Sequence, residues 1–105
     1  MTTSDTVSVI QVKTILIIDD NTELLEELSD AVAAAGYRCV TFSEGIRAIK
    51  ELCNNTVSAD LIIVDISLGQ ISGLQIVRML KLYPHTKNVP VVVMTAYYKE
   101  YTELV

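Results

Sequence analysis

The chain has few of the residues that mark several common protein classes. Its 105 residues include four glycines, two prolines, two cysteines and no tryptophan. Cys39 and Cys53 lie outside any CxxC or metal-ligand spacing, so we expect plain thiols in a reducing cytoplasm and neither a disulfide framework nor a zinc site. No apolar run approaches the ~20 residues of a membrane-spanning helix. Residues 1–12 lack the basic and apolar regions of a signal peptide, and we expect them to be a flexible lead-in.

Basic residues are also scarce. Eight Lys and Arg stand against thirteen Asp and Glu, which gives a formal net charge of −5. The basic residues are scattered and form no cluster, which argues against direct nucleic-acid binding. Half of the residues are hydrophobic and the mean hydropathy is +0.40, a composition that excludes disorder. We therefore expect one compact domain over residues 13–105.

Two hydrophobic periodicities alternate along this domain. Continuous β-branched and apolar runs at residues 15–18, 61–64 and 91–94 are typical of strands that are covered on both faces, and residues 38–41 form a further short strand candidate. Apolar residues at helical spacing follow each strand. The four predicted helices begin at Asn21 or Thr22, after a Ser43 cap, at a Ser72–Gln75 capping box, and near Tyr97; Gly36 ends the first and Pro84 closes the third.

This alternation predicts an α/β fold with a parallel sheet, in which all strands end at the same edge. Asp19 and Asp20 follow the first strand, Asp65 follows the third, and Thr95 follows the fourth. A single Asp after a strand is usually a turn or cap residue. Three carboxylates at the ends of two buried strands would instead crowd negative charge, so the cluster must take up protons or bind a cation. Hard carboxylate oxygens favour Mg²⁺, and the same ion would screen a phosphoryl group attacked by one of the carboxylates.

The chain resembles the receiver domain of bacterial two-component response regulators (CheY-like). The resemblance lies in the order and spacing of short segments from Lys13 onward. These are residues 15–21 (ILIIDDN), 36–37 (GY), 44–45 (EG) with Ala48, 60–66 (DLIIVDI), 72–73 (SG) and 89–96 (VPVVVMTA). It implies a flavodoxin-like, doubly wound parallel sheet of strand order 2-1-3-4-5. It also implies a phosphoacceptor in a phosphorelay, a regulatory domain more than an enzyme.

The resemblance assigns a role to each candidate site residue. Asp65 aligns with the phosphoacceptor, Asp19 and Asp20 with the acidic pair that holds Mg²⁺, and Ser67 with the position whose backbone carbonyl completes the metal site. Thr95 aligns with the hydroxyl that senses the phosphoryl group, and Ala96 with the small residue beside it. The implied partners are a histidine kinase or a phosphotransfer protein.

The chain departs from the family pattern at two places. Leu68-Gly69 replaces the usual Met-Pro, and Ser72 replaces the usual acidic residue before Gly73. The chain also stops before a fifth strand, so we expect a C-terminally truncated receiver domain without the family's site lysine, a role that Lys99 cannot take. An uncovered fourth strand would favour self-association, so we expect the chain to be a dimer, a marginally folded monomer or a fragment of a longer product.

Two other functions remain open on the sequence alone. The first is a degenerate receiver-like interaction module that is not phosphorylated. The second is a small Mg²⁺-dependent phosphatase, against which the Ile66-Ser67 sequence argues, since it supplies no second Asp for acid–base work.

Overall fold

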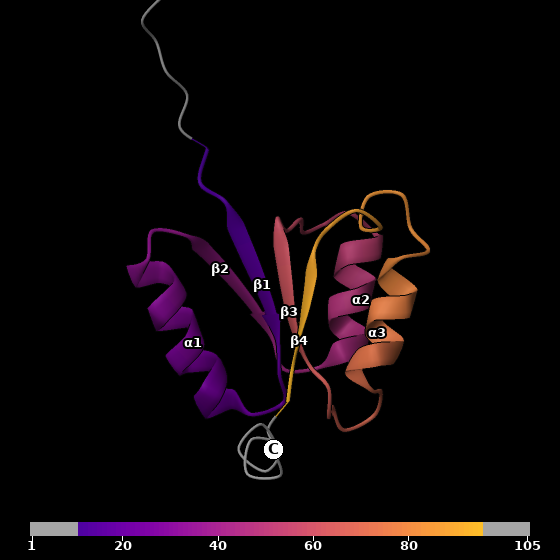
Figure 1. The fold of residues 1–105 in the computed structure, drawn as a ribbon, viewed down its shortest axis with the longest axis horizontal. Coiled ribbons are helices and arrows are strands. Elements are labelled where there is room, and N and C mark those ends of the chain that lie inside the picture. The colour runs from indigo at the N-terminus through magenta and orange to yellow at the C-terminus, as the bar shows by residue number, and fades with distance from the viewer. Residues whose placement is uncertain (1–10, 96–105) are drawn as a thin grey trace, which may run out of the picture.

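The computed structural model describes residues 11–95, which form a three-layer α/β fold (Figure 1). The strands are β1 (Thr14–Ile18), β2 (Arg38–Phe42), β3 (Leu61–Asp65) and β4 (Val91–Met94). All pair in parallel in the order β2-β1-β3-β4. The predicted parallel sheet and the order of its first four strands are therefore confirmed.

The helices cover the two faces of the sheet unequally. They are α1 (Thr22–Ala34), α2 (Gly45–Cys53) and α3 (Gly73–Leu80). In Figure 1, α1 lies on one side of the sheet, and α2 and α3 lie together on the other. The main core forms on the second side; its fully buried side chains are Leu16, Ile18, Ala48, Leu52, Ile62, Val64, Ile76 and Leu80. The apolar runs of β1 and β3 thus carry the packing that the sequence predicts. The prediction that residues 91–94 are covered on both faces is wrong, since Val92 and Val93 of β4 are 49% and 37% exposed.

Local signals fix most helix ends. The Asn21 side chain accepts the backbone N–H of Leu24 and caps α1. Gly36 adopts a φ of 94° just beyond α1, where a left-handed residue closes the helix most easily. Ser72 and Gln75 form the predicted capping box at the start of α3. The prediction that Pro84 closes the third helix is wrong, since α3 ends at Leu80 with Lys81 as its C-cap, four residues before Pro84.

The predicted Ser43 cap is wrong. Helix α2 begins at Gly45, so its N-cap is Glu44, whose side chain makes no capping hydrogen bond. Gly45 lacks the Cβ that would lie 2.6 Å from Ile76 Cδ1, so the first turn of α2 packs closely against α3.

Two predictions fall largely outside the described residues. These are the helix at residues 97–105 and the lead-in at residues 1–12, of which only Gln11 and Val12 are described. Ala96 is also outside. Among residues 11–95, no helix is long and apolar enough to cross a lipid bilayer.

Candidate functional site

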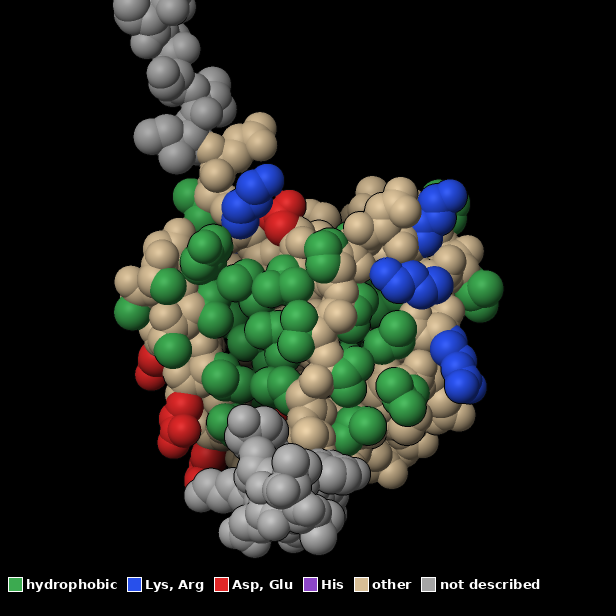
Figure 2. Space-filling view, viewed as in Figure 1, with side chains coloured by type: hydrophobic (Ala, Val, Ile, Leu, Met, Phe, Trp, Pro, Cys, Tyr) green, Lys and Arg blue, Asp and Glu red, His purple; other side chains and the backbone are tan. Residues whose placement is uncertain are grey.

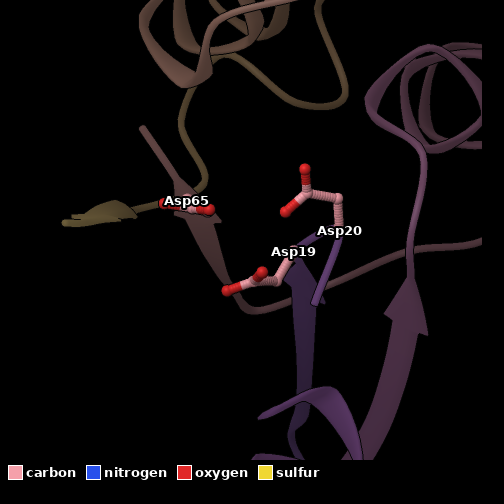
Figure 3. Close-up of side chains that lie close together, drawn as sticks. All are labelled: Asp19, Asp20 and Asp65. Atoms are coloured by element: carbon pink, nitrogen blue, oxygen red, sulfur yellow. The ribbon is translucent and has the colours of Figure 1, made fainter. Parts of the chain in front are cut away.

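Acidic side chains meet where strands β1 and β3 end (Figure 3). Asp19 and Asp20 follow β1 directly, and Asp65 is the last residue of β3. One carboxylate oxygen from each of the three residues lies within 4.8 Å of the others. The shared edge follows from the parallel β1–β3 pairing, which sets Ile18 beside Val64.

A hollow of about 290 Å³ opens over these carboxylates. Five of its lining residues were predicted from the sequence as site residues, and the structure brings them all to this one place. The lining consists of Asp19, Asp20, Asn21, Leu24, Asp65, Ser67, Met94 and Thr95. Ligand sites of open α/β sheets lie at this edge.

Backbone hydrogen bonds hold the first two acidic residues. The Asp19 N–H donates to the Phe42 carbonyl at 3.1 Å and so extends the pairing of β1 with β2. The Asn21 N–H donates to Asp19 Oδ1 at 2.9 Å. Asn21 therefore orients the Asp19 carboxylate with its backbone while its side chain starts α1.

Asp65 is held from the other side of the hollow. The Ile66 N–H donates to the Met94 carbonyl at 2.9 Å, which continues the pairing of β3 with β4 beyond Asp65. The Ser67 N–H donates to Asp65 Oδ1 at 3.3 Å. Thr95 follows β4 directly and therefore lies at the same sheet edge.

The electrostatics of the site favour a bound cation. Asp19 and Asp65 are 3% and 8% exposed, whereas Asp20 is open to solvent. Burial raises the pKa of Asp19; the Asn21 N–H opposes this change, and the charges of Asp65 and Asp20 add to it. Among the described residues, no lysine or arginine lines the hollow.

Mg²⁺ fits this donor set. The donors are hard carboxylate oxygens, and an exposed Asp20 leaves room for the waters that Mg²⁺ usually keeps. Zinc sites instead use sulfur and nitrogen ligands, and the described residues place neither cysteine nor histidine in the hollow.

Sequence reasoning missed the second role of Asn21. It identified this residue only as a helix cap, and the signal that was available is its place immediately after the acidic pair. Leu24 and Met94 also line the hollow without having been predicted.

Other polar residues of interest lie elsewhere. Asp60 accepts the Thr14 N–H at 2.7 Å, which joins the starts of β3 and β1. His85 Nε2 lies 2.6 Å from the Leu52 carbonyl at the end of α2. Both cysteines are free thiols, and burial raises the pKa of Cys53.

The comparisons with known proteins agree on one family. The profile described as "Response regulator receiver domain" matches residues 15–104. The polar-differentiation response regulator DivK of Brucella ovis is 31% identical over 85 residues, covering 81% of this chain and 68% of that protein. The phosphorylated cyanobacterial phytochrome response regulator RcpA superposes with a TM-score of 0.75 at 26% identity, covering 90% of this chain and 72% of that one. The receiver domain of sensor histidine kinase PA1611 from Pseudomonas aeruginosa, which was solved with a coordinated magnesium ion, shares the fold. It superposes with a TM-score of 0.74 at 23% identity, covering 82% of this chain and 69% of that one.

Proposed function

Since this chain belongs to the response regulator receiver family, we propose that Asp65 is its phosphoacceptor and that Asp19, Asp20, Asp65 and Ser67 hold the Mg²⁺ that the transfer requires. The chain is a receiver domain of two-component signal transduction. One observation carries the residue assignments: three carboxylates from two adjacent strands converge within 4.8 Å in one hollow. Such crowding is costly for stability alone, which favours a functional explanation.

The chemistry follows from the positions of the residues. A carboxylate oxygen of Asp65 attacks the phosphorus atom of the donor and forms a P–O bond as the bond to the donor nitrogen breaks. The electron pair of that bond stays on the donor nitrogen, and the product is an aspartyl phosphate. Mg²⁺, when bound, offsets the negative charge on the phosphoryl oxygens. The Thr95 hydroxyl donates to one of these oxygens and so senses that the group is present.

The partners and location belong to the same proposal. The phosphoryl donor is a histidine kinase or a phosphotransfer protein, and the chain acts as a regulatory domain more than as an enzyme. PA1611 is itself a sensor histidine kinase that contains a receiver domain. We assign the chain to the cytoplasm, where reduced thiols such as those of Cys39 and Cys53 are the rule.

One observation favours a second function, a receiver-like interaction module that is never phosphorylated. No lysine lines the described part of the hollow, whereas the family places one beside the acidic cluster. The phosphorylation experiment that follows separates the two functions directly.

Phosphorylation should require Mg²⁺. Incubation with acetyl phosphate and Mg²⁺ is expected to add one phosphoryl mass to the intact chain, and peptide mapping should place it on Asp65. With EDTA in place of Mg²⁺, the rate should fall at least about a hundredfold, because the crowded carboxylates then repel the phosphoryl oxygens. A chain that binds Mg²⁺ but gains no phosphoryl group would support the interaction module instead.

Strand β4 supports a further proposal, self-association of two copies. Within the described residues, β4 pairs only with β3. The carbonyls of Pro90 and Met94 accept hydrogen bonds from the β3 side, so alternation points the backbone groups of Val91 and Val93 away from β3. Figure 2 shows hydrophobic side chains over the sheet between α1 and α3, and residues 88–95 carry no charge that would repel a second copy.

A charge on this edge should weaken the self-association. Val92 is 49% exposed, and Val92→Lys is expected to raise the dissociation constant in sedimentation by about tenfold or more. Leu74→Lys is the matched control, because Leu74 is also 49% exposed but lies on α3. A wild-type chain that sediments as a monomer at all concentrations would refute the proposal.

A further inference from the structure

Gly73 lies closer to the backbone of Asp65 than any side chain would allow. It is the first residue of α3 and it is buried. A Cβ at this position would lie 2.3 Å from the Asp65 carbonyl oxygen and 2.9 Å from Ile66 Cα. The Gly73 N–H also donates to the Ile66 carbonyl at 3.0 Å. The start of α3 therefore packs directly against the backbone of Asp65 and Ile66, where β3 leads into the following loop.

The other three glycines make no such contact. A Cβ on Gly45 would meet the ends of flexible side chains, and a Cβ on Gly36 or Gly69 would meet nothing within 4 Å. Gly73 does not have the positive φ that Gly36 has. Position 73 thus requires glycine because the Asp65 backbone leaves no space for a Cβ, and not because of its backbone conformation.

We propose that Gly73 is a positioning residue for phosphoryl transfer, an inference that rests on the proposed role of Asp65. Ordinary contacts of a Cβ begin at 3.4 Å, so a side chain at position 73 must displace the Asp65–Ile66 backbone or α3 by about 1 Å. The pairing of Ile66 with Met94 and the Ser67 N–H bond to Asp65 Oδ1 transmit that displacement to the carboxylate. Asp65 then leaves its place within 4.8 Å of Asp19 and Asp20.

The positioning role and helix propensity predict different effects for Gly73→Ala. Alanine stabilises helices relative to glycine, so Gly73→Ala should be harmless or favourable if the contact with Asp65 did not matter. We instead expect it to lower the phosphorylation rate about a hundredfold at saturating Mg²⁺ and acetyl phosphate, the scale of a 1 Å misplacement of a reacting group. Gly73→Ser should have the same effect, since both variants add the same Cβ.

The experiment compares these variants with Gly69→Ala, in which the new methyl group meets open space. Rates are measured by intact mass well below each thermal midpoint, so that a mere loss of stability does not lower them. The backbone amide resonances of Ile66 and Ser67 should shift in Gly73→Ala and stay in place in Gly69→Ala. If Gly73→Ala is unfolded in buffer alone, the rates of all variants are measured in a stabilising osmolyte such as sucrose, which favours the folded state.

Two failures are distinguishable. A wild-type chain that is not phosphorylated on Asp65 refutes the proposed function. A phosphorylated wild-type chain whose folded Gly73→Ala variant reacts at the wild-type rate, with unshifted Ile66 and Ser67 resonances, refutes the positioning role alone.

Discussion

Asp65→Asn is expected to abolish phosphoryl transfer to the chain while leaving its fold in place. The amide nitrogen and oxygen of asparagine are poor nucleophiles at phosphorus, so no covalent phosphoryl group should accumulate. Shape is retained, and the amide oxygen can still accept the Ser67 N–H that Asp65 Oδ1 now accepts at 3.3 Å. Intact-mass measurement after incubation with Mg²⁺ and acetyl phosphate should detect no added phosphoryl group, against full modification of the wild type.

Asp30→Asn provides the control for this change. It removes one negative charge from an exposed position on α1, outside the hollow, and should leave the phosphorylation rate unchanged. Continued phosphorylation of Asp65→Asn at a wild-type rate would transfer the acceptor role to another carboxylate. Asp20, which is exposed beside Asp65, would be the first to test.

The sequence predicted the fold well where packing is two-sided. The runs at residues 15–18 and 61–64 indicated buried strands, and they make up most of β1 and β3. The run at residues 91–94 forms β4, but its residues Val92 and Val93 are exposed. Boundaries were less predictable because they depend on pairing partners. Asp65 was predicted to follow the third strand because it is charged, but it is the last residue of β3 because it pairs with Met94. No side-chain cap marks the start of α2, where Gly45 packs closely against α3.

The candidate site was predictable for a related reason. Asp19, Asp20 and Asp65 each end an apolar run, and parallel strands place such ends together without any knowledge of distances. The features that depend on distances could not be predicted. The contact of Gly73 with the Asp65 carbonyl joins two segments whose separation only the folded backbone defines, whereas the Asn21 N–H bond to Asp19 Oδ1 lies within one turn.

The crowding of the acidic site should be visible in stability as well as in chemistry. Asp19 is almost fully buried beside Asp20 and Asp65, and burial raises its pKa above the ordinary value of 3.8. The folded state therefore binds a proton at a higher pH than the unfolded chain does. Without Mg²⁺, this group makes the free energy of unfolding rise as the pH falls through the raised pKa, and its contribution levels off below the ordinary value.

The effect of Asp19→Asn on thermal stability should consequently reverse when Mg²⁺ is added. In EDTA at neutral pH, the variant loses a buried like charge and should gain about 1 kcal/mol, or roughly 4–8 °C in thermal midpoint. In excess Mg²⁺ the order should reverse, because a ligand stabilises the folded state more when it binds more tightly, and the variant has lost a ligand charge. Thermal unfolding of both chains, with Asp30→Asn as the charge-matched control, measures this reversal. Equal responses of the wild type and Asp19→Asn to Mg²⁺ would show that the ion binds elsewhere, and the convergence of carboxylates in the hollow would then need another explanation.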